Sequence, residues 1–411
     1  MPILLEEDLQ RPLPRMYRVR QQFDETRLED VAGTVRAELA KPEIRALVKP
    51  GMRIAVGVGS RGIQNLYTIV ETTVNSLKEL GAEPFIVSAM GSHGGGTEEG
   101  QREVLAGYGI TEERLGVPVV TTVDTVYLGN CANGRPVWFD RAAYEADLIV
   151  PINRVKLHTD FVGPIQSGLC KMLVIGLGNH KGCSAVHEEA PEVFADAIEE
   201  TVRLILQKAP VGFGIAILEN AYDKTYAVEA VPAEHLVERE KELVQIAKGN
   251  MPYIMLDEAD VIVCGAIGKD ISGAGFDPNI LGRSSVLKQF VLHIPRYQRL
   301  VLCDVTPASH GNGIGVGLFD VITKKVAEQL DLESMYANAI ACNCLGDASV
   351  PCTVDDEETA IRVALKCCRN IDRDHPRIIR IQNTLHLGEI EVSEALLDAV
   401  RADSRMSLIE N

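Results

Sequence analysis

The chain has 411 residues, of which 46% are hydrophobic and 24% are charged, and its formal net charge is −17. This length exceeds one ordinary hydrophobic core, so the composition indicates a globular protein with two domains. The acidic balance argues against nucleic acid or an anionic membrane as the main partner, because a phosphate-bearing surface requires a basic face.

The first residues lack a basic segment followed by an apolar run, and no stretch of about 18 apolar residues occurs anywhere in the chain. A cytoplasmic location is therefore expected. The ten cysteines are better interpreted as reduced thiols, mostly buried, than as a disulfide framework in so large a chain. Without a C-x-x-C pair there is no sign of a structural zinc site.

Short apolar runs alternate with amphipathic segments through the first half of the chain. Strands are expected at residues 53–58, 84–90, 148–152 and 213–218, and helices at residues 64–80, 97–106 and 192–207. This alternation predicts an α/β fold with a largely parallel sheet and helices on both of its faces.

The pattern restarts after a charged helix expected at residues 234–247 and a Gly-Asn-Met-Pro break at residues 249–252. Further strands are expected at residues 261–267, 300–305 and 377–381, and helices near residues 319–330 and 357–369. We therefore expect an N-terminal cofactor-binding α/β domain over residues 1–250 and a C-terminal α/β domain over residues 251–411. The active site is expected in the cleft between them, and the last helix is free to pack back on the first domain.

Four expected strands are followed by glycine together with Arg, His or Lys. These segments are GSRG at residues 59–62, GSHGGG at 91–96, GKD at 268–270 and TPASHGNG at 306–313. Ligands of parallel sheets sit beyond the carboxyl ends of the strands, and glycine lets the backbone approach a ligand closely. These four loops are the first candidates for a site.

In the GSRG loop, Arg61 and the start of the following helix would both favour an anion such as phosphate or carboxylate. A tight turn with a solvent-exposed arginine is the alternative. The loop is no P-loop, since G-x-x-x-x-G-K-[ST] is missing. The spacing of Gly57, Gly59 and Gly62 is only a weak match to a dinucleotide fingerprint.

The loop GSHGGGT places His93 among glycines, directly before a helix for which Thr97 is the expected N-cap. A histidine in such a loop is not expected in a core. Its simpler interpretation is a loop histidine that makes a local hydrogen bond.

Residues 154–187 form the segment richest in candidate chemistry. His158, Lys171, His180 and His187 lie there among small and apolar residues, with few acids. A lysine within SGLCKMLVIGLG either reaches out to solvent or is used, and desolvation would lower its pKa and make it nucleophilic. The spacings fit no zinc motif such as H-E-x-x-H.

The order of these motifs resembles the lactate racemase family over roughly residues 50–320. The resemblance is most specific in GSRG, in AMGSHGGGTEE, in the run from EADLIVPINRVKLH to SGLCK, in the later histidine and in IGKD. It implies a racemase or epimerase of a small 2-hydroxy acid. It also implies a nickel-pincer nucleotide (nickel pyridinium-3,5-bisthiocarboxylic acid mononucleotide) and, as partners, the proteins that make this cofactor.

The resemblance also implies roles for individual residues. Lys171 would hold the cofactor through a thioamide, and His187 would complete the nickel coordination, since His180 follows the lysine too early. His93 and His158 would be the two acid/base groups. Ser60 and Arg61 would bind the cofactor, and Arg61 with Lys269 would position the substrate.

This set of residues suits the inversion of a 2-hydroxy acid. The C–H bond at C2 is barely acidic, so a hydride route through a planar 2-keto acid avoids a carbanion. Such two-sided chemistry requires one histidine for each orientation of the substrate, and an unperturbed imidazole pKa near 6.5 suits both tasks. Nickel accepts imidazole nitrogen and soft sulfur, while the cofactor carries the hydride step.

Relatives often carry aromatic residues directly after the first-domain histidine, where this chain has Thr159 and Asp160. Two oxygen-bearing side chains would accept hydroxyl donors that an apolar wall leaves unpaired. This difference predicts that a polyhydroxylated acid is epimerised faster than lactate is racemised. The alternative is that both side chains turn away from the pocket.

Two other functions remain open from the sequence. A dehydrogenase of the NAD type would explain the α/β pattern but leave Lys171 and His187 without a role, and purified protein would then carry NAD(H). A nickel-cofactor binding protein without catalysis would bind the cofactor and tolerate the loss of His93. The sequence also leaves open whether the chain forms a homodimer.

Overall fold

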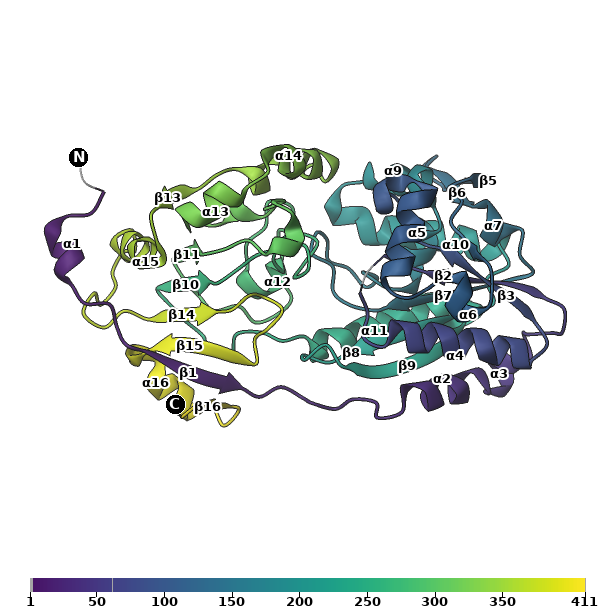
Figure 1. The fold of residues 1–411 in the computed structure, drawn as a ribbon, viewed down its shortest axis with the longest axis horizontal. Helices are drawn as coiled ribbons and strands as arrows, with labels where there is room; N and C mark the ends of the chain where they lie inside the picture. The colour runs from purple at the N-terminus through teal and green to yellow at the C-terminus, as the bar shows by residue number, and fades with distance from the viewer. Residues whose placement is uncertain (1–2, 61, 411) are drawn as a thin grey trace. The chain divides into compact units, whose positions relative to one another are not determined.

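The computed structural model describes residues 3–60 and 62–410. Contacts between residues divide the chain into two compact units. The central unit holds Glu25–Met251, and the terminal unit combines Met1–Asp24 with Pro252–Asn411. Figure 1 shows the elements of each unit.

The central unit is built on a six-stranded sheet with the strand order β4-β3-β2-β7-β8-β9. Its strands are β2 (Arg53–Val58), β3 (Glu83–Ser88), β4 (Val119–Val120), β7 (Leu148–Arg154), β8 (Phe213–Glu219) and β9 (Thr225–Pro232). All neighbours pair in parallel except β8 and β9, which are antiparallel. The predicted parallel sheet is confirmed, and β2 begins and ends at the predicted residues.

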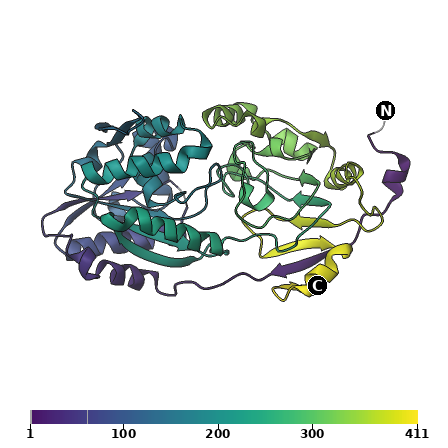
Figure 2. The same cartoon turned by 180° about the vertical axis from the view of Figure 1, so that it is seen from behind.

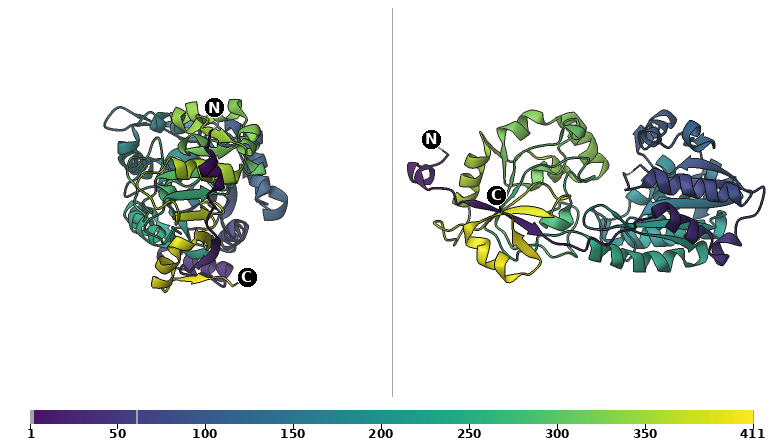
Figure 3. Two further views of the ribbon diagram at one scale, coloured as in Figure 1. Left: turned by 90° about the vertical axis from the view of Figure 1, so that its left-hand side faces the viewer. Right: turned by 60° about the horizontal axis from the view of Figure 1, so that its bottom comes forward.

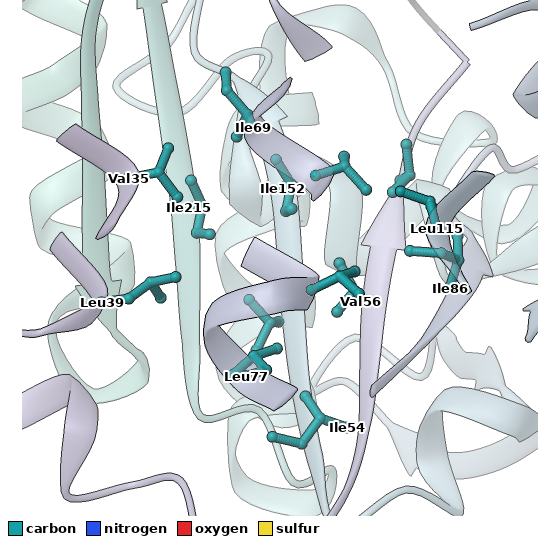
Figure 4. Packing of buried hydrophobic residues seen from close by; sticks show 14 of the residues in the cluster. Val35, Leu39, Ile54, Val56, Ile69, Leu77, Ile86, Leu115, Ile152 and Ile215 are labelled. Atoms are coloured by element: carbon teal, nitrogen blue, oxygen red, sulfur yellow. The ribbon is translucent and has the colours of Figure 1, made fainter. Parts of the chain in front are cut away.

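Alternate residues of these strands face a core on one side of the sheet. Ile54, Val56, Ile152 and Ile215 point into it, as Figure 4 shows, and all are fully buried. The helices that cover this face are α2 (Val31–Leu39), α4 (Leu66–Glu79) and α5 (Glu98–Gly107). Each fully buried Ile or Val contributes on the order of 1.5–3 kcal/mol through the removal of apolar surface from water.

The opposite face of the same sheet is covered by helices that come later in the chain. Helix α8 (Leu169–Lys171) lies directly against β8 on this face. A Cβ atom on Gly214 of β8 would come within 2.6 Å of the side chain of Leu169. Since Ile215 faces the first core, its neighbour Gly214 faces this second layer. The layer also holds α10 (Phe194–Lys208) and α11 (Leu236–Asn250), which Figure 2 shows from behind. The prediction of helices on both faces is therefore confirmed.

The remaining elements of the central unit are short. They are the antiparallel hairpin of β5 (Thr125–Asn130) and β6 (Pro136–Asp140), and the helices α3 (Pro42–Arg45), α6 (Glu112–Leu115), α7 (Arg141–Tyr144) and α9 (Asn179–His187).

The terminal unit contains an eight-stranded sheet with the order β13-β12-β11-β10-β14-β15-β1-β16. The strands are β1 (Met16–Gln21), β10 (Val261–Cys264), β11 (Arg299–Leu302), β12 (Val321–Thr323), β13 (Cys352–Val354), β14 (Ile378–Ile381), β15 (Glu389–Ser393) and β16 (Met406–Leu408). Strands β10 to β14 pair in parallel, whereas β15, β1 and β16 join antiparallel.

Six helices belong to the terminal unit among the described residues. They are α1 (Glu6–Gln10), α12 (Pro278–Leu281), α13 (Lys324–Gln329), α14 (Leu332–Ala341), α15 (Glu357–Lys366) and α16 (Leu397–Ala402). Residues of α15 pack with β10 and β11 in a shared hydrophobic core.

Two details of the terminal unit differ from the sequence analysis. The first 24 residues join this unit and not the domain expected over residues 1–250, because β1 pairs with β15 and β16 from the other end of the chain. Figure 3 shows the purple strand beside the yellow ones. The helix predicted near residues 319–330 begins only at Lys324, because the β-branched run Val321–Thr323 pairs with β11 and β13 instead.

The ten cysteines, all within the described part of the chain, form no disulfide, and six of them are buried. Among the described residues, no helix combines the length and the apolar character that a membrane crossing requires. The expected cleft between two domains stays a prediction.

Candidate functional site

The candidate site of the central unit lies at the carboxyl ends of three neighbouring strands. Strand β2 lies between β3 and β7, so the chain leaves β2 toward one side and returns on its other side. Such a reversal of strand order is where parallel α/β sheets bind ligands. The loops after β2, β3 and β7 carry Ser60, His93 and His158, respectively.

The loop after β2 differs from the prediction in one respect. Helix α4 begins at Leu66, after Asn65 in a left-handed conformation with φ 60°. Ser60 therefore lies in a loop and not at the start of a helix, as we had expected for GSRG. The hydroxyl of Tyr108 donates a hydrogen bond of 2.9 Å to the carbonyl oxygen of Ser60. Arg61, the predicted anion-binding residue, lies outside the described residues.

The loop after β3 needs its glycines. Gly94, Gly95 and Gly96 all have positive φ angles, between 64° and 68°. A Cβ atom on Gly94 would come within 2.6 Å of the backbone nitrogen of Gln101. This tight course presents His93, whose Nδ1 contacts the hydroxyl of Ser60. Thr97 caps α5 by accepting the N–H of Gly100 at 3.1 Å, as predicted.

The loop after β7 is closed on itself by an antiparallel bridge between Lys156 and Ser167. Within it, the N–H of His158 donates to the side chain of Gln166 at 2.7 Å. The N–H of Asp160 donates to Nδ1 of His158 at 3.0 Å, and Nε2 of His158 contacts Nζ of Lys171. Loop closure thus joins two of the predicted site residues, which lie thirteen positions apart in the sequence.

Lys171 ends α8 and is followed by a π-helical turn over Met172–Gly176 and then by α9. Single π-helical turns are rare and occur mainly at functional sites. His187 is the last residue of α9, and its Nδ1 lies 2.7 Å from the carbonyl oxygen of Cys183, one turn earlier. An N–H at Nδ1 bonded to that carbonyl leaves Nε2 as the nitrogen that can bind a metal.

Cys183 is a member of this cluster that the sequence analysis did not single out. Its Sγ lies 3.5 Å from Nδ1 of His187 and 3.9 Å from the hydroxyl of Ser92. Burial raises the pKa of this thiol, but the contacts with His187 and Ser92 lower it by more, so the net shift is downward. Burial lowers the pKa of His187, but the contact with Cys183 raises it by more, so the net shift is upward.

Two phenylalanines link the histidines. The Phe161 ring stacks on His158 with centroids 4.3 Å apart, and Phe194 lies 4.8 Å from Phe161 and 5.2 Å from His187. Phe161 also comes within 5.8 Å of Nζ of Lys171. An aromatic ring therefore does lie against His158, although it stands three residues after the histidine instead of directly after it.

A buried carboxyl supports the segment that carries Lys171. Glu240 of α11 is fully buried and accepts the N–H of Cys170 at 2.9 Å. A Cβ atom on Gly168 would lie 2.5 Å from this carboxyl group, so only glycine fits there. The side chain of Asn153 donates to the carbonyl of Gly168 at 2.8 Å. The start of α8 is thus held from β7 on one side and from α11 on the other.

Burial raises the pKa of Glu240 to about 7, although the backbone N–H groups of Cys170 and Leu169 oppose the shift. The folded state therefore binds this proton more tightly than the unfolded chain, whose glutamate pKa is near 4.5. It follows that Glu240 makes the folded state less stable as the pH rises from about 4.5 to about 7, and adds no further change above that range.

We expect Glu240→Gln to become more stable than the wild type as the pH rises through this window. The gain at pH 8 should be on the order of 3 kcal/mol at most, from about 1.4 kcal/mol per unit of pKa difference. Urea unfolding at several pH values would measure it. Glu234→Gln, at an exposed acid, should leave the pH dependence unchanged, and an equally flat difference for Glu240→Gln would contradict the assignment.

Lys269 belongs to the terminal unit. Its Nζ donates to the carbonyl of Gly273 at 2.7 Å and contacts the side chain of Asn338 on α14. Its backbone N–H donates to the hydroxyl of Ser309 at 2.9 Å. Two of the glycine-rich loops predicted from the sequence, at residues 268–270 and 306–313, are therefore in direct contact.

Within the central unit, the structure joins the predicted residues into one series of contacts. It runs from Ser60 to His93, from Ser92 through Cys183 to His187, and from His187 through two phenylalanines to His158 and Lys171. His180 is exposed at the start of α9 and appears in none of these contacts. The sequence analysis missed Cys183, Phe161, Phe194 and Glu240; only Cys183, four residues before His187 on a helix, left a usable signal.

Among the described residues, no group of three or more His, Cys, Asp or Glu side chains is arranged to hold a metal ion.

Known proteins resemble this chain in sequence and in fold. Residues 11–196 match the family model described as the lactate racemase N-terminal domain. The fold is similar to that of the lactate racemase apoprotein from Thermoanaerobacterium thermosaccharolyticum, with a TM-score of 0.51 and 13% identity over 89% of this chain and 93% of that one. A protein from Thermotoga maritima gives a TM-score of 0.49 at 13% identity, over 80% and 85% of the two chains, which is too distant to argue from. No curated protein matches the chain.

Proposed function

We propose that this chain is an isomerase that inverts C2 of a 2-hydroxy carboxylic acid, because its residues 11–196 match the lactate racemase N-terminal domain. The cofactor is a nickel-pincer nucleotide bound covalently to Lys171. The observation that carries the proposal is the series of contacts that joins His93, His158, Lys171 and His187 within one unit.

The residues present fit such a cofactor. Lys171 offers a half-buried amine at the end of a short helix. His187 is oriented by the carbonyl of Cys183, which leaves Nε2 for a metal. Because no three metal-binding side chains gather in the described chain, a cofactor that brings its own ligands and takes one imidazole suits the site better than a bare ion.

The bound cofactor would supply the acceptor for a hydride from C2. The chain's own residues would handle the protons and the orientation of the substrate. His93 and His158 would each take or return the hydroxyl proton, one for each enantiomer. Ser60 would hold the ring of His93 through Nδ1, and Phe161 would hold the ring of His158 by stacking. Arg61 and Lys269 would bind the substrate carboxylate and the anionic groups of the cofactor.

The substrate proposed from Thr159 and Asp160 is a polyhydroxylated acid. Both residues are partly exposed beside His158, and the carboxylate of Asp160 lies 3.9 Å from Nδ1 of His158. Oxygen atoms beside the acid/base histidine would accept hydrogen bonds from additional hydroxyl groups. The ring of Phe161, stacked on the same histidine, is an apolar neighbour, so a short aliphatic acid would still be accepted but would bind more weakly.

Nickel content separates the two histidines of α9. In protein produced together with the enzymes that make the cofactor, His187→Ala should lose nickel, because it removes the only protein ligand proposed. His180→Ala is the matched control on the same helix and should retain nickel. Metal analysis of both purified variants, with the wild type beside them, measures this. Loss of nickel in His180→Ala with retention in His187→Ala would reverse the assignment.

A further inference from the structure

The ring of His158 has one nitrogen whose hydrogen-bonding role is fixed. A backbone N–H can only donate, and the N–H of Asp160 points at Nδ1 at 3.0 Å. Nδ1 must therefore be the acceptor, without a proton of its own. A neutral imidazole in this setting carries its proton on Nε2, and a doubly protonated ring would turn two N–H groups against each other.

The second nitrogen of the ring faces Lys171. Nε2 of His158 contacts Nζ of the lysine, and an Nε2–H in this place is a donor. An ammonium group has three donors and no acceptor, whereas a free amine has one lone pair. The contact is a hydrogen bond only when Lys171 is a free amine.

We propose that the Asp160 backbone N–H and His158 together hold Lys171 as an uncharged, nucleophilic amine. Its nitrogen is ready to bond with the acyl carbon of an activated carboxyl-type group, which releases its leaving group with the bonding electron pair while the nitrogen loses a proton. This inference rests on the proposed tether at Lys171, and it gives His158 a task that precedes any acid/base role. His158 acts here as a positioning residue for the nucleophile.

The surroundings of the pair are consistent with this task. The carboxyl of Glu240 accepts the backbone N–H of Cys170, next to Lys171, and burial raises the pKa of Glu240 to about 7. The ring of Phe161 covers one side of His158 and keeps its plane fixed. The other titratable groups nearby are Asp160, whose carboxylate lies 3.9 Å from Nδ1, and His187 on α9.

Attachment of the cofactor would itself break the hydrogen bond between His158 and Lys171. Conversion of Lys171 into a thioamide delocalises the lone pair that accepts the Nε2–H, so the hydrogen bond is lost. The ring can then exchange the Asp160 N–H for the Asp160 carboxylate as the partner of Nδ1, which moves the proton to Nδ1 and frees Nε2 to accept one. One residue would thus serve the lysine first and the substrate afterwards.

The test is competitive acetylation of the cofactor-free protein with limiting acetic anhydride, followed by peptide mass spectrometry at a series of pH values. Acetylation joins the amine nitrogen to the acetyl carbon and releases acetate and a proton. The reactivity of Lys171 at each pH is divided by its own plateau at high pH, which removes the effect of burial. Lys208, an exposed lysine on α10, is the internal reference.

We expect the half-reactivity pH of Lys171 to lie at least about one unit below that of Lys208, which gives about a tenfold larger relative reactivity near pH 7.5. In His158→Ala, the profile of Lys171 should shift up to that of Lys208. His93→Ala and Asp160→Asn are matched controls, because neither removes the Asp160 N–H or the Nε2–H, and both should keep the wild-type profile.

The wild-type protein alone can overturn the proposal, whether or not a variant folds. A Lys171 profile that coincides with that of Lys208, or a Lys171 that is not acetylated at any pH, would do so. An unchanged profile in His158→Ala would do so as well. Suppose that Lys171 has a low half-reactivity pH, but protein produced together with the cofactor biosynthesis enzymes carries no adduct. This result would reject the proposed function and leave this inference standing.

Discussion

Lys171→Ala should abolish the covalent attachment of the cofactor. Intact-mass analysis of wild-type protein, produced together with the cofactor biosynthesis enzymes, is expected to show a nucleotide-sized addition, and the variant should show none. The thioamide tether proposed here needs an amine at this one position, next to His158 and directly after Cys170, whose N–H Glu240 accepts. Without this amine the cofactor has no covalent attachment to the chain.

Lys208→Ala is the control, because this lysine is exposed on α10 in the same unit and should not affect the addition. Peptide mapping of the wild-type adduct gives an independent answer. An adduct that maps to a lysine other than Lys171, or that persists in Lys171→Ala, would reject the tether.

The acid/base histidines should give the second-largest effect. His93→Ala and His158→Ala are each expected to lower the turnover rate by on the order of 10²–10⁴, the usual range for the loss of a general acid/base group. Rates should be expressed per bound nickel, since His158 also acts on Lys171 before loading. His235→Ala, at an exposed histidine after β9, is the matched control and should retain the full rate.

A partial result would also be informative. If only one of the two variants loses turnover, the two-sided scheme with one histidine for each enantiomer is wrong. If both retain the full rate while nickel stays bound, the chain is a cofactor-binding protein without this chemistry, which the sequence left open as an alternative.

The fold could be predicted where apolar runs are short and bounded by glycine. Strand β2 was predicted to the residue, because RIAVGV is buried from Ile54 to Val58 and is followed by Gly59. The antiparallel edge of the terminal sheet could not be predicted, since β1 finds its partner β15 more than 350 residues away and no local pattern encodes that pairing. The strand β12 was missed because three β-branched residues run directly into the amphipathic helix that follows.

For the site, too, the sequence predicts which residues take part but not how they contact one another. The resemblance of the motifs and their order to a known family predicted Lys171, His158, His93 and His187 as one site, and contacts within the central unit join these residues. The roles of these residues stay predictions. What the sequence could not supply is geometry. The contact between His158 and Lys171 depends on a loop closed by a bridge at Lys156, and the tautomer of His158 depends on where one backbone N–H points.

Inversion at C2 tests the central claim most directly. Nickel-loaded protein would be incubated in D₂O with one enantiomer or epimer of each acid in a panel that includes lactate and an aldonate. Chiral chromatography and proton NMR would follow the configuration and the hydrogen at C2. The account predicts inversion with the original hydrogen retained at C2, as hydride transfer requires, and a faster reaction of the polyhydroxylated acid. Nickel-loaded protein that inverts none of these acids, or inversion with full exchange of the C2 hydrogen for deuterium, would contradict it.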